Sequence, residues 1–95
     1  MYAVIFTADI ARLDEEYSAT AARMRDLALE RYGCKAFNAC TEGGKEIAVS
    51  YWDSEEQIRA WKRDPEHLAA QEKGRRVWYA SYSVDVARIV RGYAA

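Results

Sequence analysis

The stretch WKRDPEHLAAQ, residues 61–71, holds the only histidine of the chain, His67, six residues after Trp61. Imidazole has an unperturbed pKa close to neutrality, so His67 is a candidate proton acceptor in catalysis. It is also a candidate ligand for haem or a metal, or a structural residue close to a helix start. One histidine with Cys34 and Cys40, which are distant from it in sequence, does not supply the four converging ligands of a structural zinc site. We therefore expect no metal.

The sequence also contains aromatic side chains and hydrogen-bond donors that could bind a ligand. Asn38 and Arg59 are candidate donors to an anion that develops on a ligand. Alternation places Asn38 on the strand face of Ala36 and Cys40, where an amide either is hydrogen-bonded in the core or lines a cavity. A solvated surface role is the alternative for Arg59, and core packing is the alternative for the tryptophans. The side chains that could form an apolar slot for a ligand are Phe37, Tyr51, Trp52, Trp61 and Trp78.

The elements that must position these residues begin with a short strand pattern at 2–8, which is rich in β-branched and aromatic residues. An amphipathic helix pattern follows over 13–33. Asp14 is placed to cap its start and Gly33 to end it. A second strand pattern covers 34–41 and contains both cysteines. Their separation along one strand prevents a disulfide, and we read them as small buried residues.

Two further helices and two further strands follow. The glycine pair 43–44 predicts a hairpin turn before a strand at 46–52. Ser54 and Gln57 form a capping box for the next helix, and Asp64–Pro65 interrupts it and starts another, which we expect to end near Gly74. The last strand pattern runs over about 78–91, and alternation puts Tyr79 and Tyr82 on opposite faces.

The order β, α, β, β, α, β predicts one α+β domain over residues 1–95. It is the ferredoxin-like split βαβ fold, a four-stranded antiparallel sheet with its helices on one face. The strand at 46–52 is apolar on both sides, so the uncovered face of the sheet needs a partner. We therefore expect a homodimer in which two sheets pack face to face, with the long last strand reaching beyond its own sheet.

Composition excludes several classes of partner. The formal net charge is −1, and acidic and basic residues are mixed along the chain, so no basic stripe indicates nucleic acid. No apolar run is long enough to cross a membrane. The amino terminus carries no basic leader, and a cytoplasmic location is the expectation.

The residues from Ile47 to Arg91 resemble the antibiotic biosynthesis monooxygenase family, which belongs to the dimeric α+β barrel superfamily. The resemblance rests on a strand ending in Trp52, a capped helix ending in Trp61, a following helix with His67, and a last strand opened by Trp78 and Tyr79. It implies a cofactor-independent monooxygenase that oxidises a planar aromatic phenol or quinol with O₂. In that case His67, Trp61 and Asn38 are the candidate catalytic residues, and Trp52, Tyr51, Phe37, Trp78 and Arg59 are the candidate substrate-binding residues.

Two alternatives stay open beside this function. One is a dimer that binds a small aromatic ligand, or responds to stress, without turnover. The other is haem degradation, which related proteins perform with a histidine ligand about ten residues after the tryptophan that Trp61 matches. That position here is Gln71, a poor ligand for haem iron, so we expect neither haem nor another cofactor.

Overall fold

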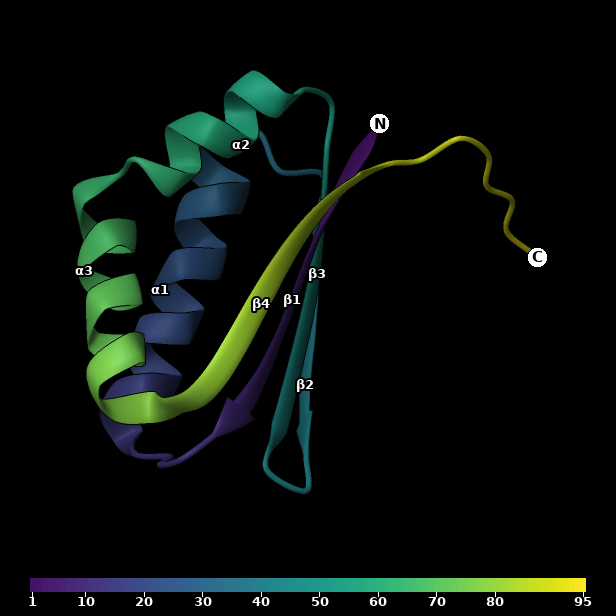
Figure 1. Ribbon diagram of the computed structural model, residues 1–95. Coiled ribbons are helices and arrows are strands. Elements are labelled where there is room, and N and C mark those ends of the chain that lie inside the picture. Colours follow the sequence, from purple (N-terminus) through teal and green to yellow (C-terminus); the bar gives the residue numbers. More distant parts are fainter.

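Four strands and three α-helices follow one another along residues 1–95 of the computed structural model (Figure 1). In chain order they are β1 (Tyr2–Ile10), α1 (Glu15–Arg31), β2 (Ala36–Glu42), β3 (Lys45–Trp52), α2 (Glu55–Lys62), α3 (Pro65–Lys73) and β4 (Tyr79–Arg88). A π-helical turn, η1 (Gly74–Trp78), joins α3 to β4.

The strands form one antiparallel sheet in the order β2-β3-β1-β4, and the helices lie on one side of it (Figure 1). This confirms the predicted split βαβ fold. Val4, Leu27, Trp52, Ile58 and Trp61 form most of the core between the sheet and the helices. No helix is long and apolar enough to cross a membrane.

The predicted helix starts are confirmed in their hydrogen bonds. The Asp14 carboxylate accepts from the backbone N–H of Tyr17 at 2.7 Å. Ser54 and Gln57 exchange both bonds of the capping box at 3.3 Å each. Asp64 accepts from the N–H of Glu66 at 2.8 Å, and Pro65 occupies the first turn of α3, where its missing N–H leaves no bond unmade. Each bond satisfies a backbone donor that the helix itself leaves free.

The last strand is shorter than its sequence pattern predicts. It ends at Arg88, which pairs with Tyr2 at the start of β1. The N–H of Ile89 donates to the carbonyl of Met1 at 3.0 Å. No residue of β1 remains to pair with the end of the chain, and residues 89–95 leave the sheet as an extended tail (Figure 1). The prediction of a strand to residue 91 is therefore wrong, because β1 limits its length.

The passage from α3 to β4 also differs from the prediction. The α-helix ends at Lys73, next to Gly74 as predicted, but the π-helical turn η1, which was not predicted, then carries the chain on to Trp78. Gly74 is buried, and a Cβ atom there would lie 2.7 Å from the Tyr79 ring, so only glycine lets that ring pack against the turn. The pairing of β4 with β1 then shifts at Asp9/Ile10. After this shift the Tyr79 ring contacts Phe6, as Tyr82 does, and the predicted opposite placement of the two tyrosines is wrong.

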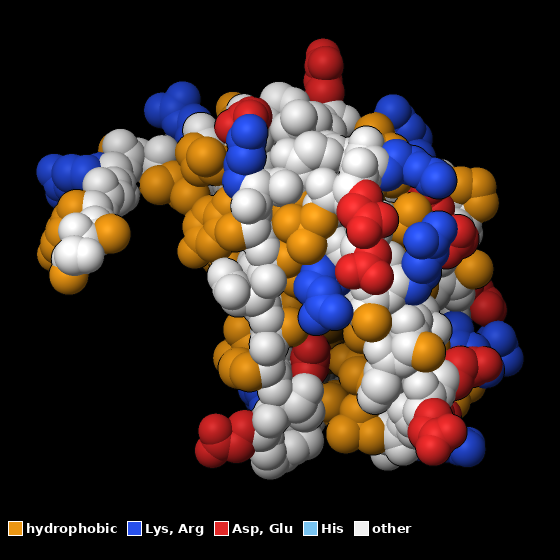
Figure 2. Space-filling model, turned by 180° about the vertical axis from the view of Figure 1, so that it is seen from behind, with side chains coloured by type: hydrophobic (Ala, Val, Ile, Leu, Met, Phe, Trp, Pro, Cys, Tyr) orange, Lys and Arg blue, Asp and Glu red, His pale blue; other side chains and the backbone are white.

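The face of the sheet opposite the helices is uncovered. Hydrophobic side chains are visible on that side of the molecule (Figure 2). The strand register places Ile5, Ile47, Val49 and Tyr51 on it. Cys34 is buried, but Cys40 is exposed, so the burial predicted for both cysteines holds only for the first. Cys40 lies on β2, an edge strand whose side chains are mostly exposed.

Candidate active site

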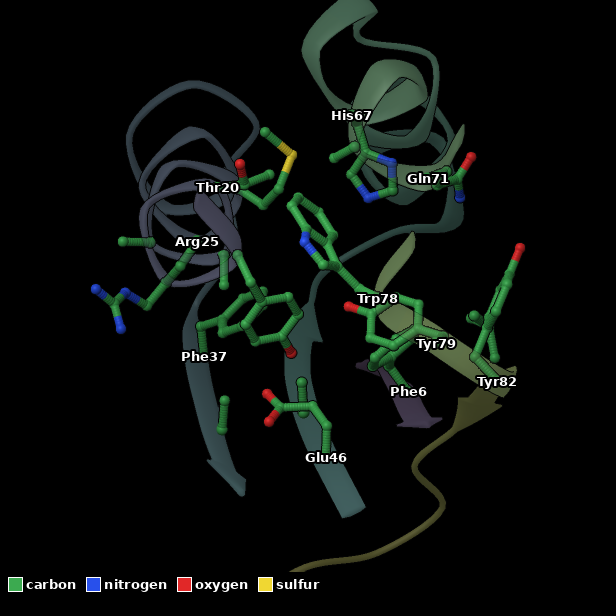
Figure 3. Close-up of a pocket in the computed structure, with 18 of the residues that line it drawn as sticks. Phe6, Thr20, Arg25, Phe37, Glu46, His67, Gln71, Trp78, Tyr79 and Tyr82 are labelled. Carbon is green, nitrogen blue, oxygen red and sulfur yellow. The ribbon is translucent and has the colours of Figure 1, made fainter. Parts of the chain in front are cut away.

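A cavity of about 440 Å³ lies between the sheet and the helices α1 and α3 (Figure 3). Its volume is in the range of small-molecule sites in proteins. Strands β1, β2 and β3 form one wall, and η1 and the start of β4 close an end. Its wall is mainly hydrophobic, and its large side chains are the aromatic rings of Phe6, Tyr17, Phe37, Trp61, Trp78, Tyr79 and Tyr82. Such a lining favours a flat, apolar ligand.

His67 and Trp61 meet on the helix side of this cavity. Their ring centroids are 4.4 Å apart and the planes are inclined by 74°, an edge-to-face contact. Trp61 is held in place because its indole N–H donates to the backbone carbonyl of Met24 at 3.2 Å, and because it packs on Trp52 and Phe37. The turn at Asp64, which ends α2 and begins α3, brings the imidazole over the indole.

The environment of His67 keeps its imidazole neutral. The pKa of His67 is lowered from 6.5 to about 4, chiefly by burial and also by the nearby Lys62 ammonium, while Asp64 acts in the opposite direction. The Nδ1 atom is buried and has no hydrogen-bond partner. A neutral imidazole has one donor and one acceptor nitrogen, so His67 retains unused hydrogen-bonding capacity at the cavity wall.

Trp78 provides a second unpaired polar atom at the cavity wall. Its Nε1 is buried without a partner, and its ring packs edge-on against Tyr17 at 5.3 Å. Buried donors are almost always hydrogen-bonded in proteins, so an unpaired one calls for a functional explanation. Two such atoms on one cavity, on His67 and Trp78, are typical of a site that is completed by a ligand.

The sheet end of the cavity carries a polar group of a different kind. Glu46 is only 6% exposed, and the Thr41 hydroxyl donates to its carboxylate. Burial raises the pKa of Tyr79, with a further contribution from the neighbouring Tyr17 hydroxyl, and burial also raises the pKa of Tyr17. Both phenols are therefore neutral at pH 7 and remain hydrogen-bond donors.

Four of the residues predicted from the sequence line this cavity, namely Phe37, Trp61, His67 and Trp78. The other four lie elsewhere. Asn38 pairs with Val49 in the sheet and, with Tyr51, lies on its uncovered face. Trp52 is fully buried in the core, where its indole N–H donates to the Ser50 hydroxyl at 2.8 Å.

Arg59 is exposed on α2, 3.8 Å from Glu55 one turn away. The cavity of one chain therefore does not unite Asn38 or Arg59 with His67. For Asn38 the reason is the strand alternation itself, because the helices cover the face that carries Phe37 and leave the face of Asn38 open.

Glu46 and Tyr17, the polar groups at the sheet end of the cavity, were not predicted as site residues, although the sequence pattern contains evidence for both. Glu46 alternates with Ala48, Ser50 and Trp52 along β3, so it shares the face of a buried tryptophan. A charged residue in register with core positions is rarely accidental. Tyr17 lies on the apolar stripe of α1 and carries a hydroxyl into it. No group of three or more His, Cys, Asp or Glu side chains converges in a way that could hold a metal ion.

Comparison with known proteins identifies a related protein of known sequence. No family model matches the sequence. The uncharacterized protein YqjZ of Bacillus subtilis (strain 168) is 46% identical over 91 residues, which are 95% of this chain and 80% of YqjZ.

Solved structures show the same fold at low identity. The cofactor-independent oxygenase SnoaB of Streptomyces nogalater superimposes with a TM-score of 0.80 at 12% identity, over 96% of this chain and 94% of SnoaB. Rv0793 of Mycobacterium tuberculosis superimposes with a TM-score of 0.80 at 13% identity, over 99% of this chain and 100% of Rv0793. A Nitrosomonas europaea protein assigned by inference to the antibiotic biosynthesis monooxygenases has a TM-score of 0.78 at 11% identity, over 96% of this chain and 100% of that protein. The chain therefore belongs to the same family as YqjZ, and its fold is that of the antibiotic biosynthesis monooxygenases.

Proposed function

We propose that this protein is a cofactor-independent monooxygenase that acts on a planar aromatic phenol or quinol. The observation that carries the proposal is the aromatic cavity with the His67–Trp61 pair in its wall. The fold shared with SnoaB, a cofactor-independent oxygenase, supports it. The unpaired polar atoms of His67 and Trp78 support a ligand with oxygen substituents.

The chemistry needs little from the protein. An electron-rich phenolate reduces O₂ directly, one oxygen atom enters the ring, and the other leaves as water with two hydrogens of the substrate. The aromatic walls hold the ring and exclude water. His67, neutral at rest, receives the phenol proton. The phenolate that forms beside the new imidazolium offsets the cost of charging a buried histidine, because opposite charges in a low dielectric attract strongly.

Oxygen uptake with a panel of polycyclic quinols is the direct test. Replacing His67 by alanine should lower kcat/KM by roughly 10²–10⁴-fold, the usual contribution of general acid–base catalysis. Leu68→Ala is the matched control, since its side chain is 51% exposed on the same helix and lies outside the cavity. Uptake by the natural protein no faster than by a His67→Ala, Trp61→Phe double variant would disprove catalysis. Thermal stabilisation by the quinols without oxygen consumption would favour the ligand-binding dimer.

The uncovered sheet face supports the homodimer as part of the proposal. Ile47 is 40% exposed there, beside Val49 and Tyr51. In a face-to-face dimer these side chains become buried, and Asn38 on the neighbouring strand enters the interface. That arrangement assigns Asn38 and Tyr51 to contacts between protomers.

Replacing Ile47 by glutamate should convert the dimer to a monomer at micromolar concentration, because an unpaired carboxylate buried between two sheets costs several kcal/mol. Sedimentation velocity measures the change. Leu68→Glu introduces the same charge at an exposed apolar position on α3 and should leave the dimer intact. A natural protein that sediments as a monomer would contradict the dimer.

A further inference from the structure

Glu46 is a buried carboxylate to which the proposed reaction gives no task. It rises from β3 toward the aromatic rings of the cavity (Figure 3). The register pairs it with Ala8 of β1 and Thr41 of β2, so it lies on the helix-facing side of the sheet. At 6% exposure it is almost as buried as the core residues around it.

This carboxylate has few partners within the protein. The Thr41 hydroxyl donates to it, the Tyr17 hydroxyl is a second neighbouring donor, and no lysine, arginine or histidine lies within ion-pair distance. Lys45, the preceding residue, lies on the opposite face and pairs with Asp9 at 3.0 Å. An ionised carboxylate accepts at about four lone-pair positions, and burying it without a cation is costly unless hydrogen bonds replace the lost water. Glu46 therefore has acceptor capacity left for a group inside the cavity.

Glu46 makes the sheet end of the cavity negative, because no positively charged side chain faces it there. Tyr17 from α1 and Tyr79 from β4 are neutral phenols near the carboxylate. Arg25 directs its guanidinium away from the cavity in Figure 3. Lys62 and His67 belong to the opposite, helix end of the lining.

We propose that Glu46 is the specificity-determining residue of the cavity, which selects a neutral aromatic ligand whose hydroxyl donates to its carboxylate. A hydroxyl that donates to an ionised acceptor forms a strong hydrogen bond. A methyl ether leaves the carboxylate desolvated and unpaired, and an aromatic carboxylate is repelled by it. The inference rests on the proposed function only in taking the ligand to be aromatic. It adds that the ligand carries a hydroxyl at the sheet end of the cavity, which stays protonated on Glu46 and is distinct from the hydroxyl whose proton passes to His67.

Isothermal titration with four naphthalene probes at pH 7 tests this assignment on the full-length chain. The probes are 2-naphthol, 2-methoxynaphthalene, 2-naphthoate and the cationic 2-naphthylmethylamine. We expect 2-naphthol to bind at least about tenfold more tightly than the ether, since a hydrogen bond to a charged group contributes roughly that factor. We expect 2-naphthoate to bind more weakly still.

Glu46→Gln removes the charge at nearly constant shape. It should bring naphthol and ether within about threefold of each other, and it should strengthen 2-naphthoate binding at least about tenfold. Glu42→Gln makes the same charge change at an exposed position of β2 and should alter none of these ratios.

Several outcomes would overturn the inference. They are equal binding of naphthol and ether to the natural protein, tightest binding of the cationic amine, and no binding of any probe. The comparison of naphthol with its ether uses only the natural protein. It therefore tests the proposal even if the Glu46→Gln variant fails to fold. None of these titrations depends on O₂. Selective naphthol binding without oxygen uptake by any quinol would remove the proposed reaction and leave the role of Glu46 in place.

Discussion

Replacing Trp52 by alanine is expected to lower the free energy of unfolding by about 3–5 kcal/mol. The side chain is 0% exposed and belongs to the central core cluster with Val4, Leu27 and Trp61. Removing the indole leaves a large cavity beneath Trp61, whose ring lies 5.2 Å away. It also leaves the buried Ser50 hydroxyl without its partner. For a domain with a total stability of about 5–15 kcal/mol, this loss is a large fraction.

Urea unfolding followed by circular dichroism measures the effect. Trp52→Phe is the matched control and should cost less, because the smaller ring keeps most of the packing and loses mainly the hydrogen bond to Ser50. A loss below about 1 kcal/mol for Trp52→Ala would show that this residue is not a core anchor. The result also bears on ligand binding, since Trp52 lies behind the cavity wall and should influence a ligand only through stability.

The stability of the protein should rise as the pH is raised from 4 to 6.5, and His67 should account for up to about 3 kcal/mol of the rise. Its pKa is lowered from 6.5 to about 4 in the folded state, chiefly by burial. Between these values the unfolded chain binds a proton that the folded chain does not, so acid favours unfolding. The contribution is complete above pH 6.5 and is lost as the pH falls toward 4.

Comparison with His67→Gln isolates this contribution. Glutamine keeps a polar side chain of similar size and does not titrate. Asp64 and Glu66 also make stability depend on pH, mainly below this window, because hydrogen bonds from Tyr32 and Arg23 lower the pKa of their carboxyls from 3.8 and 4.5, respectively. Their contribution is common to both proteins and cancels in the difference. Equal dependence of both stabilities on pH would show that the imidazole is solvated and not held neutral in the cavity wall.

Much of the fold is predictable from the sequence because its signals are local. Asp14, Ser54 and Asp64 each cap a helix through a bond to a residue two or three positions ahead. The glycine pair at 43–44 adopts positive φ angles of 57° and 78°, which the hairpin turn requires. Such interactions depend only on nearby residues, so type and spacing reveal them.

The candidate site is predictable only in part. Phe37, Trp61 and Trp78 were candidates for an apolar slot because they are aromatic, and His67 was a candidate as the only imidazole; all four line the cavity. Residue type and spacing did not separate Trp52 from these, although Trp61 and Trp78 line the cavity and Trp52 lies in the core behind it. The distinction depends on how α2 crosses the sheet, and nothing local to Trp52 records that crossing. For Asn38 the strand and its alternation were predicted correctly. The sequence did not show which of the two strand faces the helices would cover, and Asn38 lies on the other one.

The order of the elements, their caps and the apolar character of both sheet faces can therefore be predicted from local patterns. The composition of the cavity depends instead on tertiary packing. Tyr79 reaches it because the π-helical turn η1 and the shifted pairing at Asp9/Ile10 rotate it toward Phe6. Glu46 becomes a buried acceptor there because α1 and β4 bring Tyr17 and Tyr79 over it. These contacts join residues about 30 to 70 positions apart, and their geometry depends on the packing of the whole domain, which no local pattern encodes.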